Sequence, residues 1–247
     1  ANYHIVPNVI FDPAQEDQGY DTKRLVEVLR SEELVGFVTR TDAMFEFGKA
    51  AVFALPSGAF ADYFFRVGNL QSDAEFCHAM LFWALPHMAQ ASSIVSDTWS
   101  ISTTAASLGS GLSQYRGGDA KVAWSHMFEY LPTSSDSQER LKRSIASMEG
   151  SSDRLLFLNS FRSSGRLEAA VKSAADDLGF SDRVDFLSIY GIQPGQGGDV
   201  SLLCDLTSFF GERGLEGMVE HGTARSTPVF NIHKRTYFPD FRKPIVK

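Results

Sequence analysis

Cysteine is scarce in this chain. Its 247 residues include two, Cys77 and Cys204, which form no Cys-x-x-Cys pattern and no Cys/His spacing typical of metal ligands. This argues against a disulfide framework and against a zinc site. Both cysteines stand among apolar residues, so we predict buried free thiols in a reducing compartment.

Long hydrophobic runs and an excess of positive charge are also lacking. No apolar stretch approaches the roughly 20 residues of a membrane-spanning helix, and no signal peptide is visible at the start, so we expect a cytoplasmic location and no membrane contact. The formal net charge of −7 argues against a nucleic-acid partner. Basic residues do gather from Arg225 onward, where six accompany one acid, Asp240. A solvated terminus and a contact with phosphate or an acidic partner both explain this cluster.

What the chain has is an alternation of short apolar runs with longer amphipathic segments. The predicted strands are 92–96, 121–130, 155–158 and 184–189, with an edge strand at 228–238. The predicted helices are 21–34, 73–90, 101–112, 136–148, 167–178 and 201–218. Two further apolar runs, within 51–70, flank Pro56-Ser57-Gly58 and predict a strand pair around a tight turn. This alternation indicates an α/β fold in which a mainly parallel twisted sheet is covered by helices on both faces, and the absence of a linker favours a single domain, 1–247.

The first of these helices, 21–34, is predicted from the position of its apolar residues. Leu25, Val26, Val28 and Leu29 stand on one side of a charged segment, which predicts an amphipathic helix with an apolar face formed by these residues. Asp21 precedes it as a candidate N-cap.

The stretch LLFLNSFRSSGRL (155–167) is the most informative for function. A buried strand ends in short polar residues and a glycine, Gly165, and a helix follows. A helix N-terminus carries unpaired N–H groups and the positive end of the helix dipole, so the turn is suited to a phosphate. An ordinary strand-to-helix connection explains the same residues, because no full Walker or dinucleotide fingerprint is present.

Three segments together resemble one family. FALPSGAFADYFFRVGNL (53–70) resembles the N-terminal hairpin of orotate phosphoribosyltransferases, and RLLFLNSFRSSGRLEAAV (154–171) resembles the ribose-phosphate loop of type I phosphoribosyltransferases. Between them, SSIVSDTWSISTTAASL (92–108) is similar to the strand, pyrophosphate loop and helix of that superfamily. The resemblance covers about residues 20 to 190, and its order and spacing agree with the family.

The resemblance implies a type I phosphoribosyltransferase-like sheet with a small hood formed by 1–70 and 225–247. It also implies a ligand, 5-phosphoribosyl-1-pyrophosphate (PRPP) or a related nucleotide, Mg²⁺ carried by that ligand, and a homodimer. The implied phosphate contacts are Ser163, Ser164, Gly165 and Arg166. The implied ribose contacts at the catalytic positions are Asn159 and Ser160. The implied pyrophosphate contacts are Asp97, Thr98, Trp99 and Ser100. Phe64 and Phe65 would border the base, although both suit a core equally well.

The sequence departs from the family at several of these positions. The family has acids where this chain has Asn159 and Ser160, because carboxylates bind the ribose hydroxyls and stabilise positive charge at the anomeric carbon. Pro56 stands where the family often has a lysine. The family's basic loop should follow 121–130, where this chain reads SHMFEYLPTSSDSQERLKR. Of its basic residues, Arg140, Lys142 and Arg143 have the spacing of a polar helix face.

Three functions therefore remain open. The protein binds a phosphoribosyl compound as a sensor, with weakened or lost transfer; or it is an active Mg²⁺-dependent phosphoribosyltransferase that acts on a nitrogenous base; or it is a structural interaction module. The intact Ser-Ser-Gly-Arg turn favours the first two, and the missing acids and basic loop favour binding over transfer. A serine hydrolase is not indicated, because Ser57 lacks the G-x-S-x-G frame. His126 is the best candidate among the histidines, although a core histidine is the more common explanation of such a residue. His221 lies in a second polar cluster, which a surface loop explains equally well.

Overall fold

The computed structural model describes residues 22–46, 52–54, 60–61, 63–125, 135–148, 154–162, 165–192, 200–207, 218–219, 229–231 and 236–238. No helix within these ranges is long and apolar enough to span a bilayer. The cellular location stays a prediction.

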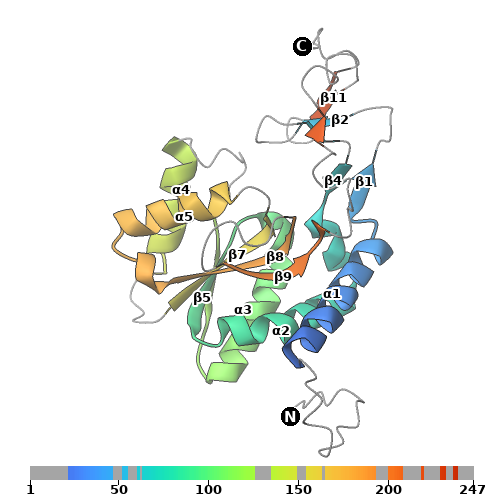
Figure 1. Cartoon of the computed structure of the whole chain (residues 1–247). Helices are drawn as coiled ribbons and strands as arrows, with labels where there is room; N and C mark the ends of the chain where they lie inside the picture. Colours follow the sequence, from blue (N-terminus) through green and yellow to red (C-terminus); the bar gives the residue numbers. More distant parts are fainter. Residues whose placement is uncertain are drawn as a thin grey trace, which may run out of the picture.

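A five-stranded parallel sheet forms the centre of the molecule (Figure 1). Its strands lie in the order β6 (Lys121–Trp124), β5 (Ala91–Ser96), β7 (Arg154–Arg162), β8 (Val184–Gly191) and β9 (Val200–Asp205). All four neighbouring pairs are parallel. Counted along the chain, this is the 2-1-3-4-5 order of doubly wound sheets, and the order reverses between β5 and β7. The expected α/β class is confirmed.

Helices cover both faces of this sheet, as expected. One face carries α1 (Thr22–Arg40), α2 (Ala74–Met88) and α3 (Ser102–Arg116), and the other carries α4 (Ser135–Ala146) and α5 (Arg166–Asp177) (Figure 1). Within the described ranges, the connections also contain three short 3₁₀ helices: η2 (Val67–Ser72), η3 (Trp99–Ile101) and η4 (Ser181–Arg183).

The apolar run of β7 packs against the helices on both faces of the sheet. Leu156 and Leu158 belong to the core cluster that includes residues of α1, α2 and α3, whereas Leu155 and Phe157 belong to the cluster that includes residues of α4 and α5. All four side chains are 0% exposed. Because successive side chains of a strand point to opposite faces, one unbroken apolar run fills both cores.

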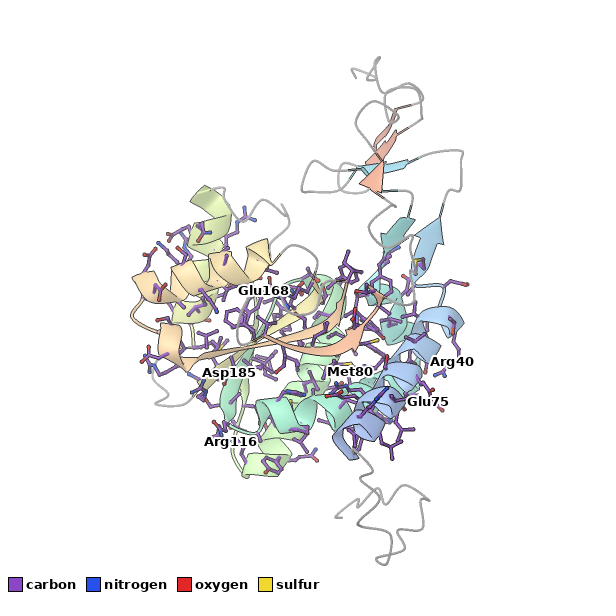
Figure 2. All side chains as sticks on the ribbon, viewed as in Figure 1. Arg40, Glu75, Met80, Arg116, Glu168 and Asp185 are labelled. Atoms are coloured by element: carbon purple, nitrogen blue, oxygen red, sulfur yellow. The ribbon has the colours of Figure 1, made fainter. Side chains whose placement is uncertain are left out.

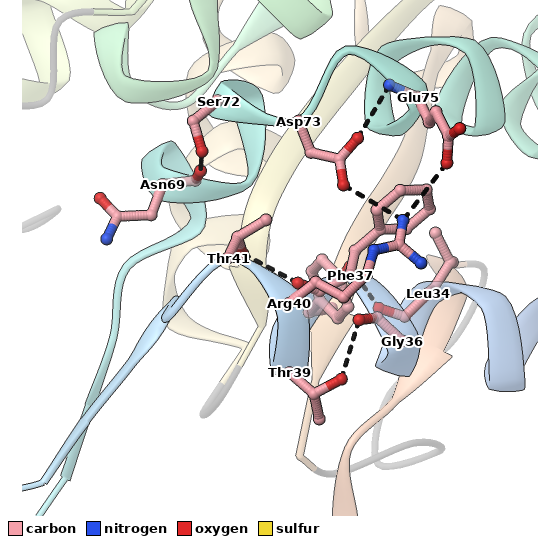
Figure 3. Close-up of polar contacts among 11 residues, drawn as sticks. Leu34, Gly36, Phe37, Thr39, Arg40, Thr41, Asn69, Ser72, Asp73 and Glu75 are labelled. Carbon is pink, nitrogen blue, oxygen red and sulfur yellow. Dashed lines mark hydrogen bonds and ion pairs between the residues drawn. The ribbon is translucent and has the colours of Figure 1, made fainter.

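Polar contacts join the end of α1 to the start of α2 (Figure 3). The Arg40 guanidinium lies 3.1 Å from Asp73 Oδ2 and 3.5 Å from Glu75 Oε2. Asp73 caps α2, since its Oδ1 accepts a hydrogen bond from the Glu75 N–H at 2.9 Å. The guanidinium also lies 4.4 Å from the ring centre of Phe37, which packs edge-on against Phe76. These contacts join the last turn of α1 to the first turn of α2.

Two small sheets lie beside this body, at the top of Figure 1. One pairs β1 (Met44–Glu46) with β4 (Tyr63–Phe65). The other has the order β10 (Met218–Val219), β3 (Phe60–Ala61), β2 (Val52–Ala54), β11 (Val229–Asn231) and β12 (Thr236–Phe238). β2 and β3 form the expected antiparallel pair. The second sheet thus joins strands from the first quarter of the chain to strands near its end, and the hood boundaries of 1–70 and 225–247 stay a prediction.

Three secondary-structure expectations need correction, and a fourth is mostly untested. The segment predicted as a helix from 201 to 218 begins as strand β9, because its short apolar run, in which Leu203 and Cys204 are buried, pairs with β8. The edge strand predicted over 228–238 is an antiparallel hairpin of β11 and β12. The strand predicted to end at Leu158 continues to Arg162, because its polar end still pairs with β8. The loop expected at 191–199 lies mostly outside the described residues.

The apolar face predicted for the first helix is also wrong. Val26, Val28 and Leu29 are all more than 40% exposed, and the buried residues of α1 are Leu34, Phe37 and Val38, near its C-terminal end. The helix runs six residues past its predicted end, from 34 to Arg40, and this second half is the part that contacts the core. Asp21 lies outside the described residues. The two thiols are free; Cys204 is buried as expected, while Cys77 is only partly buried.

Candidate functional site

The candidate site lies where the carboxyl ends of β5 and β7 meet. In open α/β sheets, ligands bind outside the carboxyl ends of the strands at the point where the strand order reverses, and here that point lies between these two strands. Asp97 is the first residue after β5, and its N–H donates to the Leu158 carbonyl at 3.0 Å. Asp97 is 3% exposed, which is unusual for an aspartate.

The Asp97 carboxylate is bound by a residue of the neighbouring strand. Its Oδ2 accepts hydrogen bonds from the Ser160 N–H at 3.0 Å and from the Ser160 hydroxyl at 2.6 Å. Its Oδ1 is buried and has no hydrogen-bond partner among the described residues. Burial raises the pKa of this carboxyl to about 6, because desolvation outweighs the bonds from Ser160, which act in the opposite direction.

The residue that follows β6 joins the same cluster. The hydroxyl of Ser125 donates to the Asp97 carbonyl at 2.9 Å and to the Ser96 carbonyl at 3.1 Å, and Ser125 is 0% exposed. The ends of β6, β5 and β7 are therefore connected through buried polar groups. Sequence analysis missed Ser125, whose position directly after an apolar strand was the available signal.

A second buried network lies on the α5 side of β7. The Asn159 amide donates from Nδ2 to Glu168 Oε1 at 3.0 Å, and its Oδ1 accepts from the Phe161 N–H at 3.2 Å. Glu168 also pairs with Arg162, whose Nε lies 3.5 Å from Oε1. The two charged side chains are 6% and 7% exposed. Figure 2 shows Glu168 at the end of α5 that lies over the sheet.

These contacts define what Asn159 and Ser160 do in the structure. Both sit inside β7 and not in the turn that follows, and each binds another side chain of the cluster. Asn159 holds Glu168, and Ser160 holds Asp97. Neither Arg162 nor Glu168 was identified from the sequence, because an arginine and a glutamate near a helix start are usually solvated and only the fold reveals their burial.

Of the turn predicted to hold a phosphate, the structure describes Gly165 and the start of α5. Gly165 is the N-cap of α5 with φ of 71°, a left-handed conformation that a residue with a side chain rarely adopts, and no side chain caps the helix. A Cβ placed there would lie 3.9 Å from Glu168 Oε2 and 4.0 Å from Arg162 Nη2. Ser163 and Ser164 lie outside the described residues, and so does the side chain of Arg166, which begins the helix.

The expected pyrophosphate loop follows β5. The Thr98 and Ser100 hydroxyls are 2.5 Å apart, and the Thr98 carbonyl accepts from the Ser96 hydroxyl at 2.8 Å. The Gln71 amide donates to the Ser100 carbonyl and accepts from the Thr104 N–H in the first turn of α3. One amide at the start of α3 is thus already satisfied by the protein. Trp99 begins η3, and its side chain is outside the described part.

The two phenylalanines expected beside a base lie on β4. Phe65 is packed in an aromatic group, with its ring centre 5.2 Å from that of Phe161 and 5.2 Å from that of Tyr190. Phe64 pairs through its backbone with Phe45, and nothing is described of its side chain. For Phe65 the structure therefore favours the core role that the sequence left open.

The region of the missing basic loop lies largely outside the described residues, as do His126 and His221. Its described end is α4. There Lys142 Nζ lies 2.6 Å from Asp177 Oδ2 on α5, and Arg143 Nε lies 3.2 Å from Glu139 Oε1. These cations pair with acids of α4 and α5, in agreement with the expected polar helix face.

No family model and no curated protein matches the chain. Among solved structures it is similar to the UMP synthase of Leishmania donovani, with 13% identity, a TM-score of 0.49, and coverage of 78% of this chain and 40% of that one. It is also similar to the orotate phosphoribosyltransferase of Francisella tularensis, with 12% identity, a TM-score of 0.43, and coverage of 78% and 94%. The orotate phosphoribosyltransferase of Mycobacterium tuberculosis H37Rv, in complex with Fe(III) dicitrate, gives 16% identity, a TM-score of 0.39, and coverage of 72% and 97%. Two of these three structures are orotate phosphoribosyltransferases, the family that the sequence segments resemble.

Proposed function

We propose that the protein binds a 5-phosphorylated ribose compound, PRPP or a related nucleotide, at the carboxyl ends of β5 and β7. The observation that carries this proposal is the concentration of buried polar side chains at the one place in the sheet where the strand order reverses. Buried polar groups are costly to stability and gather where they have a role. Asp97, Asn159, Ser160, Arg162 and Glu168 are all less than 9% exposed here.

The phosphate end of the ligand belongs at the α5 N-terminus. The first N–H groups of a helix have no partner within the helix, and the helix dipole adds positive potential, so an anion is stabilised there. Arg162 supplies a guanidinium close to Gly165, and Glu168 keeps that guanidinium in place. In this proposal Arg162 is the arginine that contacts the phosphate, a role that the sequence resemblance gave to Arg166.

The test is a titration with a minimal ligand. We expect ribose 5-phosphate to bind the wild-type chain with micromolar to sub-millimolar affinity in isothermal titration calorimetry, and Gly165→Val to abolish binding, because valine disfavours φ of 71° and displaces the turn.

Gly179→Val is the matched control. Gly179 has φ of 68° and, like Gly165, has room for a Cβ, but it lies at the other end of α5. This variant should lose similar stability and keep the affinity. The absence of heat with ribose 5-phosphate, PRPP and inorganic phosphate would overturn the binding proposal.

A second candidate function is transfer of the phosphoribosyl group to a nitrogenous base. The buried carboxyl of Asp97, which contacts Ser160 at one of the positions where the family has acids, favours it. No cluster of three or more His, Cys, Asp or Glu side chains stands ready for a metal among the described residues, so Mg²⁺ would be carried by the phosphate oxygens of the ligand. Release of pyrophosphate from PRPP with Mg²⁺ and a panel of bases separates transfer from binding.

The expected homodimer belongs to this proposal as well. The resemblance implies a two-fold pair, and no described contact decides it. Light scattering during size-exclusion chromatography should give twice the mass of the 27.3 kDa chain. A mass of one chain at micromolar concentration would remove the dimer and leave the binding proposal intact.

A further inference from the structure

The two oxygens of the Asp97 carboxylate have different surroundings. Oδ2 is held by both donors of Ser160, and Oδ1 is buried without a donor among the described residues. A buried acceptor that lacks a hydrogen bond destabilises the fold, more so when it carries charge. Buried polar atoms almost always have a hydrogen-bond partner, so an unpartnered one needs an explanation. A donor supplied by a bound ligand is such an explanation.

The position of this oxygen is set by adjacent residues of one strand. Asn159 holds Glu168, which lies beside the Gly165 turn, and Ser160 holds Asp97. Two adjacent residues of β7 therefore hold two different groups: Asn159 holds the side chain beside the turn proposed for the phosphate, and Ser160 holds the Asp97 carboxyl at the end of β5.

We propose that Asp97 is the residue that recognises the ribose: its Oδ1 accepts a hydrogen bond from the 2- or 3-hydroxyl of the bound sugar. Ser160 is the positioning residue, since its N–H and hydroxyl both donate to Oδ2 and leave Oδ1 for the sugar. The acid that β7 lacks at Ser160 is thus supplied from β5. This inference rests on the proposed function and adds to it a requirement for a hydroxylated sugar.

The chemistry favours a hydroxyl over other donors. A charged amine placed against the buried carboxylate would have to lose its hydration, which is costly, whereas a neutral hydroxyl is desolvated at a lower cost. A hydrogen bond from a hydroxyl to a carboxylate is stronger than one between neutral groups. Removal of such a bond lowers affinity by about ten- to a hundredfold.

The experiment compares four anions at pH 8, where the Asp97 carboxyl is ionised: ribose 5-phosphate, its 2-deoxy and 3-deoxy analogues, and inorganic phosphate. The three sugar phosphates carry the same phosphate monoester, so the ratios of their affinities isolate the hydroxyl contacts, and inorganic phosphate reports on the anion site alone. We expect the wild-type protein to bind ribose 5-phosphate about ten- to a hundredfold more tightly than one of the two deoxy analogues.

Asp97→Asn is the informative variant. The Asn oxygen can still accept both Ser160 donors, while an amide NH₂ replaces the unpartnered oxygen. We expect this variant to bind inorganic phosphate like the wild-type protein and to lose the preference for ribose 5-phosphate. Gly179→Val is again the control: it lies at the other end of α5, has no part in the Asp97 cluster, and should keep the preference.

The outcomes separate the two proposals. Equal affinities of the wild-type protein for ribose 5-phosphate and both deoxy analogues, or an unchanged preference in Asp97→Asn, would overturn the assignment of Asp97 and leave phosphate binding standing. Failure of the wild-type protein to bind any of the four anions would overturn the proposed function itself. A thermal melt of each variant shows that the chain is folded when binding is measured.

Discussion

At the scale of single residues, the buried carboxyl of Asp97 makes the stability of the folded protein depend on pH. Its pKa is raised from 3.8 to about 6 in the folded protein, so the folded state binds its proton more tightly than the unfolded state does. Its contribution to stability is therefore fully present below pH 3.8, falls as the pH rises through about 6, and is constant above that. Between low and high pH, the contribution of Asp97 to the free energy of unfolding changes by on the order of 3 kcal/mol.

Asp97→Asn removes this dependence. We expect the variant to be more stable than the wild-type protein at pH 8, and the difference to shrink steadily between pH 7 and pH 4, because a neutral amide does not titrate. Urea unfolding at several pH values measures the free energy of unfolding of both proteins as a function of pH. A variant that is less stable than the wild-type protein at pH 8 would contradict the assignment of a strained buried carboxylate.

Sequence reasoning identified this residue but not its surroundings. Asp97 entered the candidate site through the resemblance of its segment to a pyrophosphate loop. Its partner Ser160 stands 63 residues further along the chain, and a hydrogen bond over that separation depends on which strands become neighbours. The same holds for Ser125, which comes from a third strand end.

At the scale of elements, β7, the turn at Gly165 and α5 form one unit. The buried pair of Arg162 and Glu168 connects the end of the strand to the first turn of the helix, and Asn159 adds a hydrogen bond to the same carboxylate. A buried ion pair contributes little net stability, but the loss of one partner leaves an uncompensated charge.

We therefore expect Glu168→Gln to lower the free energy of unfolding by about 3 kcal/mol, because Arg162 stays buried without its counter-charge. The double variant Arg162→Met with Glu168→Gln should be more stable than Glu168→Gln alone, since it removes both charges and keeps an acceptor for Asn159. Urea unfolding of the two variants and the wild-type protein decides this. A double variant that is less stable than Glu168→Gln alone would contradict the coupling of the two buried charges.

The elements that the sequence predicted well are those with an unambiguous period or an unbroken buried run. β5, the apolar half of β7 and β8, together with α2, α3 and α5, lie close to their predicted places. β9 was assigned as a helix because a short apolar run fits a buried helix as well as a strand, and its pairing with β8 settles the matter. The end of β7 was missed because polar residues usually mark a turn, and here they continue the ladder into the site.

At the scale of the whole molecule, ligand binding and folding are linked. A ligand that binds the native state alone stabilises it by about 2.7 kcal/mol at a concentration of one hundred times Kd. We expect ribose 5-phosphate at saturating concentration to raise the melting temperature of the wild-type protein and of Gly179→Val, and to leave that of Gly165→Val unchanged. Scanning calorimetry measures the shift. An equal shift in both glycine variants would place the ligand away from the turn.

The overall architecture was predictable because it depends on order and alternation, which the sequence carries directly. The candidate site was predictable only in part, since its location follows from the strand order while its chemistry depends on residues such as Glu168, whose burial the fold alone produces.

The parallel pairing of β2 with β11 sets an order for the folding of the chain. Val52 pairs with Val229, so closing this contact loops out most of the polypeptide, whereas the pairs of the central sheet join strands much nearer in sequence. The entropy lost on closure grows with the length of the loop, which delays the distant pair. During synthesis on the ribosome, β2 and its hairpin partner β3 emerge long before β11 exists, so the edge of β2 that faces β11 stays without a neighbouring strand. This small sheet is therefore the part of the nascent protein most exposed to mispairing with another chain.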